Sequence, residues 1–322
     1  MKKKMVKVLK VVLIVLAAII VIGSFLLGKA VADMVMHQNK DNDTKSNSLK
    51  QLEAWGYDLE AFNAAYTGTE INVTAEDGNA VPGTAFTADD DSDKWVILVH
   101  GAGGDRVCTY PLAQGYLERG YNVITIDQRG CGDSADENVT FGINEKLDVE
   151  AVVMYARNEL GASEVIVHGQ SMGAQTTALY ASNVTPGEAG CADAVICDSP
   201  VPGMEYMLRS VFFDSDNEED FHGLLPNYLI FTSGIASRLF YGIDYADGDT
   251  IEAVKTDMLP TMVILSENDK VCLPDKVEEV YNNIGSDEKE LVRVGSAHIE
   301  GVIDDPDGYM DSVMNFLGRY GL

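Results

Sequence analysis

The run Gly-Gln-Ser-Met-Gly at 169–173 contains a serine, Ser171, that could act as a nucleophile. An apolar, β-branched stretch precedes this run, and a helix-forming stretch, 174–181, follows it. The pattern predicts a sharp turn from strand to helix, which strains the serine backbone and exposes its hydroxyl. The residues two before and two after the serine must then be small because they come into contact. Gly169 and Gly173 meet that requirement.

A serine hydroxyl needs a base to accept its proton and a third group to orient that base. His298 and Asp269 each come just after an apolar run that predicts a strand. The chain order Ser171, Asp269, His298 is one that enzymes with a serine at a strand-to-helix turn use. We therefore expect these three residues to form a catalytic triad. Glu267 and Asp198 are alternatives for the acid.

Acyl transfer also needs two backbone N–H groups to hold the charge that develops on the carbonyl oxygen. The glycine-rich loop 100–104 follows a predicted strand, and Ala102 is the expected donor within it. Met172, directly after the serine, is the expected second donor. The loop lacks the glycine spacing of nucleotide-binding motifs. No organic cofactor and no metal is expected.

The elements that must position these residues follow from the alternation of short apolar runs with helical stretches. This alternation predicts an α/β fold whose parallel sheet is covered by helices on both faces. Residues 202–247 interrupt it, since they contain many aromatic residues and no predicted strand. They predict a helical insertion, either a lid above the carboxyl ends of the strands or a small core of its own. The predicted strands are 70–74, 80–87, 95–100, 122–127, 164–168, 194–198, 261–266 and 291–295, and the predicted helices include 52–66, 145–160 and 274–284.

Over roughly residues 70–322 these motifs resemble those of the α/β-hydrolase superfamily. The matches are His-Gly-Ala-Gly at 100–103, Asp-Gln-Arg-Gly at 127–130, the serine turn, the loop at Asp269, and Gly-Ser-Ala-His at 295–298. The chain is most similar to bacterial membrane-anchored serine hydrolases, and more distantly to monoacylglycerol lipases and prolyl-oligopeptidase-like enzymes. One departure is that the proline of the acid loop, Pro274, comes later than in the family pattern.

The resemblance implies an α/β-hydrolase fold with a mostly parallel eight-stranded sheet, helices on both faces and a small lid inserted after the sixth strand. It also implies that Ser171, Asp269 and His298 form the triad and that Ala102 and Met172 form the oxyanion hole.

The N-terminus has a different character from the rest of the chain. A lysine-rich segment precedes Val11–Gly28, which carries no charge, and Lys29 closes this run. As a helix it would span about 27 Å, close to the hydrocarbon thickness of about 30 Å. Because basic flanks remain cytoplasmic, the rest of the chain is expected outside the cell membrane. The sequence Ala-Val-Ala at 30–32 resembles a cleavage site, so secretion after signal cleavage is the alternative.

We therefore expect a cytoplasmic tip and transmembrane signal anchor over 1–32, a polar stalk over 33–50, and a hydrolase domain over 51–322 with its insertion at about 202–247. All 51 acidic residues follow residue 32, with only 17 of the 23 basic ones. Such a negative surface disfavours nucleic acid and anionic lipid headgroups. The five cysteines lack metal-site spacing, and a disulfide cannot be assigned from their positions.

The predicted activity is that of a serine hydrolase, carboxylesterase- or lipase-like, acting on a small-molecule acyl ester through an acyl-enzyme intermediate. An acyltransferase or a peptidase would use the same triad. A non-catalytic surface protein that retains the fold is the alternative of a different class. The sequence does not indicate the oligomeric state.

Overall fold

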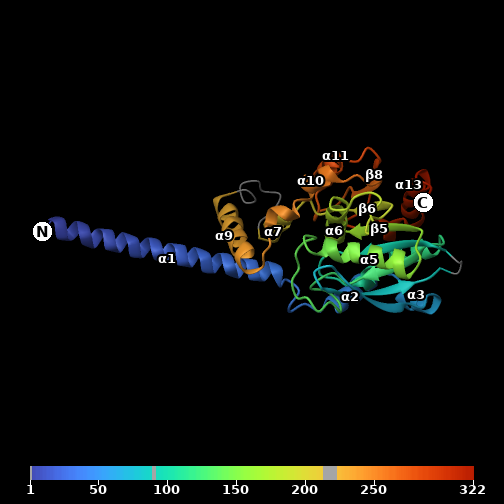
Figure 1. Cartoon of the computed structure of the whole chain (residues 1–322), viewed down its shortest axis with the longest axis horizontal. Helices are drawn as coiled ribbons and strands as arrows, with labels where there is room; N and C mark the ends of the chain where they lie inside the picture. Colours follow the sequence, from blue (N-terminus) through green and yellow to red (C-terminus); the bar gives the residue numbers. More distant parts are fainter. Residues whose placement is uncertain (1, 89–91, 213–222) are drawn as a thin grey trace. The chain divides into compact units, whose positions relative to one another are not determined.

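The computed structural model describes residues 2–88, 92–212 and 223–322 (Figure 1). They divide into two compact units. The helical unit comprises residues 1–36 and 208–245, and the sheet unit comprises residues 37–207 and 246–322.

The sheet unit is built on one eight-stranded sheet with the strand order β1-β2-β4-β3-β5-β6-β7-β8. Strands β3 to β8 run parallel to one another, whereas β1 and β2 are antiparallel to their neighbours. The mostly parallel eight-stranded sheet predicted from the sequence is thus confirmed. The strands are β1 (Thr69–Thr74), β2 (Ala80–Phe86), β3 (Lys94–Val99), β4 (Asn122–Ile126), β5 (Glu164–Gln170), β6 (Ala194–Asp198), β7 (Thr261–Ser266) and β8 (Lys289–Val294).

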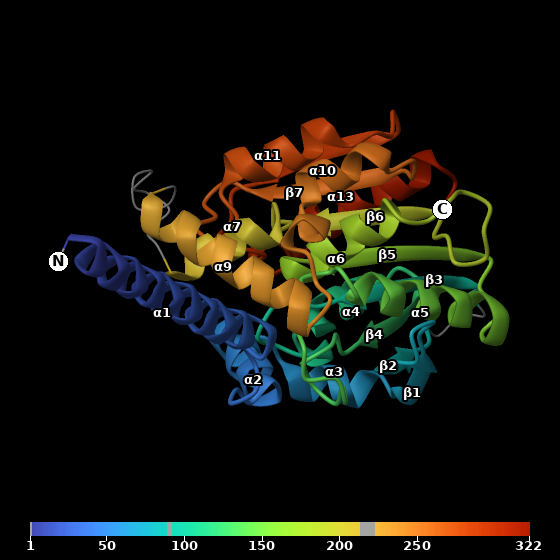
Figure 2. The same ribbon diagram turned by 60° about the vertical axis from the view of Figure 1, so that its left-hand side comes forward.

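Helices cover both faces of this sheet because its central strands are apolar on both sides. In β3, Ile97 packs with α5 (Glu145–Glu159) and α6 (Met172–Ala181) in one core cluster. The next residue, Leu98, packs with α4 (Tyr110–Leu117) and α13 (Pro306–Arg319) in another. Figure 2 shows these helices on either side of the strands. The remaining helices of the sheet unit include η1 (Arg106–Thr109), α10 (Thr250–Ala253), α11 (Pro274–Asn283) and α12 (Gly301–Asp304).

The region before the sheet differs from the expected stalk and from the expected helix over 52–66. Helix α2 (Thr44–Ala54) occupies much of the predicted stalk, and a separate helix, α3, covers Leu59–Ala65. The chain breaks between them at Gly56, whose φ of 68° suits glycine. The polar residues of α2 do not all face water, since Ser48 is fully buried. Residues 44–54 are therefore a folded part of the sheet unit.

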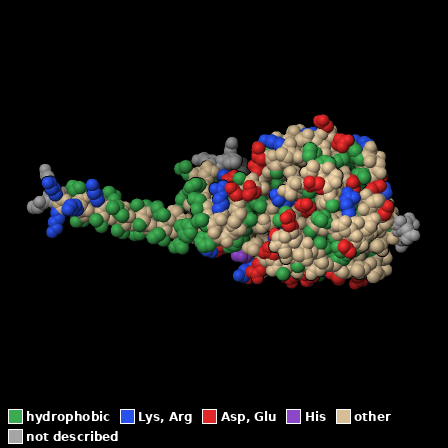
Figure 3. Space-filling view, viewed as in Figure 1, with side chains coloured by type: hydrophobic (Ala, Val, Ile, Leu, Met, Phe, Trp, Pro, Cys, Tyr) green, Lys and Arg blue, Asp and Glu red, His purple; other side chains and the backbone are tan. Residues whose placement is uncertain are grey.

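The helical unit consists of α1 (Lys2–Met36), the end of α7 (Met204–Phe212) and α9 (Leu224–Phe240). Among the described residues, α1 is the helix long and apolar enough to cross a membrane. Its apolar side chains are exposed between Met5 and Leu27, and basic side chains gather at its N-terminal end (Figure 3). Helices α7 and α9 belong to the predicted insertion, of which residues 213–222 lie outside the described residues.

Candidate active site

The turn between β5 and α6 holds Ser171 in a strained backbone conformation, with φ 57° and ψ −119°. Both flanking glycines are required by close backbone contacts. A Cβ on Gly169 would lie 2.1 Å from the carbonyl oxygen of Gly173, and a Cβ on Gly173 would lie 2.1 Å from that of Val99. The expectation that both positions must be small is confirmed.

The structure brings Ser171, His298 and Asp269 into one hydrogen-bonded chain. His298 Nε2 lies 2.8 Å from Ser171 Oγ, and His298 Nδ1 lies 2.6 Å from Asp269 Oδ2. The Asp269 side chain is fully buried and that of His298 is 19% exposed. This is the geometry of a nucleophile, a base and an orienting acid.

The other oxygen of Asp269 organises the loop that follows it. Asp269 Oδ1 accepts hydrogen bonds from the backbone N–H groups of Val271 and Cys272, at 2.7 and 3.0 Å. The loop therefore folds over the carboxylate before α11 begins at Pro274. The late position of this proline is accommodated without moving the acid away from His298.

Asp198, an alternative acid in the sequence, belongs to a separate buried network. Tyr309 donates its hydroxyl hydrogen to Asp198 Oδ2 at 2.9 Å, so the Tyr309 oxygen must accept from His168 Nε2, 3.1 Å away. His168 Nδ1 then accepts from the Tyr116 hydroxyl at 2.9 Å. Burial lowers the pKa of His168 to about 3, which keeps its ring neutral. The other alternative acid, Glu267, is exposed.

The glycine-rich loop after β3 passes close to Ser171, since a Cβ on Gly101 would lie 3.2 Å from Ser171 Cβ. His100 fixes the start of this loop: its Nδ1 lies 2.6 Å from the Gly101 carbonyl, and its Nε2 accepts from the Gln128 N–H. The Gln128 side chain donates to the His100 carbonyl and accepts from Thr176 on α6. The loop that carries Ala102 is thus joined to the helix that begins at Met172.

Helix α2 contacts the other end of the same loop. The sequence did not indicate this contact. Asn47 Nδ2 donates to the Gly103 carbonyl at 3.1 Å, and Ser48 Oγ accepts from the Asp105 N–H at 2.8 Å. Only the polar composition of this region was visible in the sequence, and that pattern favours a stalk as much as a buried contact.

Asp269, Cys272 and His298 place three potential metal ligands within 4.8 Å of one another. A metal binds the thiolate form of cysteine. Burial raises the pKa of the Cys272 thiol well above its usual value, which disfavours that form. The two other groups bond to each other in the chain described above. This arrangement suits proton transfer better than metal binding.

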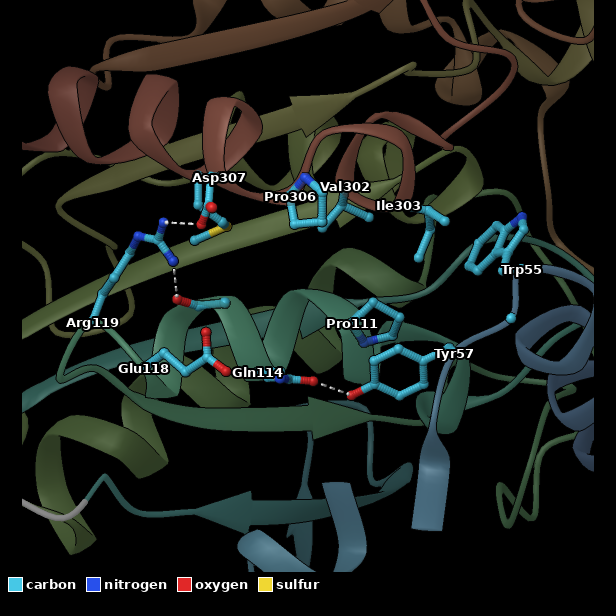
Figure 4. A pocket seen from close by; sticks show the side chains of 13 residues that line it. Trp55, Tyr57, Pro111, Gln114, Glu118, Arg119, Val302, Ile303, Pro306 and Asp307 are labelled. Atoms are coloured by element: carbon cyan, nitrogen blue, oxygen red, sulfur yellow. Dashed lines mark hydrogen bonds and ion pairs between the residues drawn. The ribbon is translucent and has the colours of Figure 1, made fainter. Parts of the chain in front are cut away.

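A pocket of about 280 Å³ opens elsewhere on the sheet unit (Figure 4). Trp55 and Tyr57 line it from the α2–α3 connection, and Arg119 forms an ion pair with Asp307 at its edge. None of its described lining residues belongs to the hydrogen-bonded chain of Ser171. We therefore assign it no part in the candidate active site.

Comparisons with known proteins concern the fold of the chain. Residues 94–213 match the family model described as alpha/beta hydrolase fold. The chain is 25% identical over 310 residues to the uncharacterized protein YqkD of Bacillus subtilis, covering 91% of this chain and 88% of that protein.

Solved structures with a similar fold include the esterase Pf2001 of Pyrococcus furiosus, with a TM-score of 0.63 and 22% identity over 82% of this chain and 95% of that one. The enol-lactonase of Burkholderia xenovorans has a TM-score of 0.54 and 17% identity, covering 77% of this chain and all of that one.

Proposed function

We propose that this chain, whose residues 94–213 match the family model described as alpha/beta hydrolase fold, is a serine hydrolase that cleaves an ester or a related acyl bond. The observation that carries the proposal is the hydrogen-bonded chain from Asp269 through His298 to Ser171. It supplies a nucleophile at a strained turn, a base in contact with it, and a buried carboxylate that orients the base.

In the proposed mechanism, His298 Nε2 accepts the Ser171 proton as Oγ attacks the acyl carbonyl carbon. Asp269 holds the proton on His298 Nδ1 and stabilises the charged ring. His298 then gives its proton to the leaving alcohol, and the acyl group remains on the serine. A water molecule activated by His298 releases the acid and restores Ser171.

The backbone N–H groups of Met172 and Ala102 are proposed to hold the oxyanion. Met172 is the first residue of α6, where N–H groups lack partners within the helix and the helix dipole favours negative charge. Ala102 follows Gly101, which lies close to the serine, since a Cβ added to Gly101 would lie 3.2 Å from Ser171 Cβ. The contacts of His100 and Asn47 with the carbonyls on either side of Ala102 support this proposal, because an oxyanion hole works best when its donors are held in place before the substrate binds.

The test is Ser171→Ala, assayed with p-nitrophenyl acyl esters of increasing chain length. We expect activity to fall by roughly 1,000-fold or more. A fluorophosphonate probe should label the parent on Ser171 and should not label the variant. Undiminished ester hydrolysis by a folded Ser171→Ala variant would show that the mechanism is wrong.

We further propose that α1 anchors the protein in the cell membrane, with the sheet unit on the extracytoplasmic side. The length and composition of α1 support a span. The helix continues through residues 30–32 to Met36, and Ala32 is fully buried, which favours a retained anchor over a cleaved signal. Mass spectrometry of the mature chain should find residues 1–32 present. Protease added to intact cells should degrade the sheet unit.

A further inference from the structure

Helix α9 of the insertion packs directly on α1, and the two helices lie side by side in both Figure 1 and Figure 2. The two backbones meet at Gly28, where an added Cβ would lie 2.3 Å from the Thr232 carbonyl oxygen. Polar contacts lie on both sides of this point. The Tyr241 hydroxyl donates to Asp33 Oδ1 at 2.7 Å, and the Tyr228 hydroxyl bonds to Ser24.

The side chains of α9 are distributed in the opposite way to those of a helix on the surface of a water-soluble protein. Its buried face includes the small residues Ser233, Ala236 and Ser237. Several of its large apolar side chains point outward: Leu224 is 92% exposed, and Phe231 and Leu239 are each 67% exposed, whereas Ile230 is buried. A water-soluble amphipathic helix turns its apolar face toward the protein. Small residues at the helix contact with large apolar residues outside are typical of helices that pack within lipid.

We propose that the exposed apolar face of α9 lies in the lipid bilayer beside α1, at the membrane interface near Lys29. This inference rests on the proposed membrane anchoring of α1. The bilayer is favoured over a protein partner because the face of α9 continues the exposed apolar surface of the helix on which it packs. With α1 anchored as proposed, lipid would cover its exposed side chains, and the exposed side chains of α9 belong to the helix that packs against it.

Side chains at the α1–α9 contact also fit an interfacial position. Lys29 ends the uncharged run of α1, forms an ion pair with Asp33 at 2.7 Å, and lies 4.9 Å from the centre of the Phe240 ring. Tyrosines gather at this level of membrane proteins because they have an apolar ring and a polar end, and Tyr241 lies here, bonded to Asp33.

The sequence sets a limit on how deep the helix can lie. Five acidic residues occur between 214 and 220, shortly before α9. Carboxylates are costly to place in hydrocarbon. We therefore propose that α9 enters the membrane only in part and does not cross it.

The experiment uses the full chain in phosphatidylcholine vesicles, with and without brominated acyl chains, which quench tryptophan by contact. Phe231→Trp and Leu239→Trp each introduce a tryptophan on the exposed face of α9. Ile20→Trp does so in the middle of α1, and the parent, with Trp55 and Trp95, supplies the background signal. An interfacial helix buries its apolar face roughly 5–10 Å into the boundary of headgroups and chains, so we expect about twofold quenching of both introduced α9 tryptophans.

The Ile20→Trp variant separates the two proposals. If its tryptophan is quenched by lipid while those at 231 and 239 are quenched only by aqueous iodide, α1 is anchored and the proposal for α9 is wrong. If lipid does not quench the tryptophan at position 20, both the anchoring and the proposal for α9 are overturned. Lipid quenching at all three positions, with iodide ineffective at 231 and 239, is the result that supports the proposal.

Discussion

The sheet unit and the helical unit use apolar side chains in opposite ways. In the sheet unit, large apolar residues such as Ile97 and Leu98 lie in cores on the two faces of the sheet. In the helical unit, several residues of that size point outward, such as Phe231 and Leu239, and the backbones of the two helices meet closely at Gly28 and Thr232. Hydrophobic burial accounts for the first arrangement in water. The second arrangement leaves large apolar side chains exposed to water, and contact with lipid would remove this unfavourable exposure. The proposed membrane contact of α1 and α9 would thus place the two units in different solvents.

The largest expected effect concerns the chemistry of the sheet unit alone. Asp269→Asn should reduce kcat by about 1,000- to 10,000-fold, because the amide no longer holds the proper tautomer of His298. Asp198→Asn is the matched control from the buried tyrosine network, and it should cost far less activity. Both are measured by ester hydrolysis with the full chain. An equal loss of kcat in the two variants would contradict the assignment of Asp269, and not Asp198, as the acid of the triad.

The backbone contacts of the serine turn should give the next largest effect. Gly173→Ala forces a Cβ against the Val99 carbonyl, so we expect it to lower the free energy of unfolding by about 3 kcal/mol. Gly318→Ala is the control, because nothing lies within 4 Å of its added Cβ. Because Gly318 lies in a helix, its replacement by alanine should leave the free energy of unfolding unchanged or raise it. Thermal unfolding followed by circular dichroism compares the two, and similar melting temperatures would contradict the close contact at Gly173.

Buried His168 should make the sheet unit sensitive to acid. Its pKa is about 3 in the folded protein, against about 6.5 when unfolded. The unfolded chain therefore binds the proton first as the pH falls, and stability present above about pH 6.5 is lost progressively toward pH 3. By pH 5 the loss from this residue should be about 2 kcal/mol.

The matched variant is His168→Gln, which keeps a donor and an acceptor but does not titrate. It should be less stable than the parent at pH 7.5, and the difference should shrink by pH 5. Denaturant unfolding at both pH values measures this. A constant difference would show that His168 does not carry the acid sensitivity.

The smallest expected effect lies in the helical unit. Gly28→Ala introduces a Cβ against the Thr232 carbonyl and should weaken the α1–α9 contact by about 1–2 kcal/mol. Amide hydrogen exchange over residues 224–240 should then become roughly 5- to 30-fold faster. Gly23→Ala, with nothing within 4 Å of its Cβ, is the control on the same helix. Faster exchange in α5 as well would mean that the two units are not independent in this respect.

How much the sequence revealed depended on the range of the interactions involved. The strands and the serine turn were predictable because apolar runs and two glycines define them locally, and β6 and β7 have the predicted bounds. The spatial meeting of Ser171, Asp269 and His298 followed from the position of each after a strand of one parallel sheet. The support of the glycine-rich loop by Asn47 was not predictable, since it joins segments 56 residues apart without a local pattern.

The pairing of α9 with α1 is also a long-range contact that the sequence does not predict. An aromatic-rich insertion predicts a small core of its own as readily as a contact with another segment. The decisive feature is which face of α9 is buried, and this depends on a helix about 200 residues earlier in the chain. The break of the predicted helix 52–66 at Gly56 and the start of α2 within the predicted stalk were not evident from the local pattern either.

All five cysteines lie within the described residues of the sheet unit, and each is buried and free. The native protein therefore offers no exposed thiol to an oxidant, whereas the unfolded chain offers all five at once. An odd number of thiols cannot pair completely, and exchange among them is slow compared with the folding of many small domains. Refolding in an oxidising buffer would consequently divide the molecules between those that fold before oxidation and those trapped by mispaired disulfides. For this chain, the yield of correctly folded protein from such refolding would depend on whether folding or oxidation comes first.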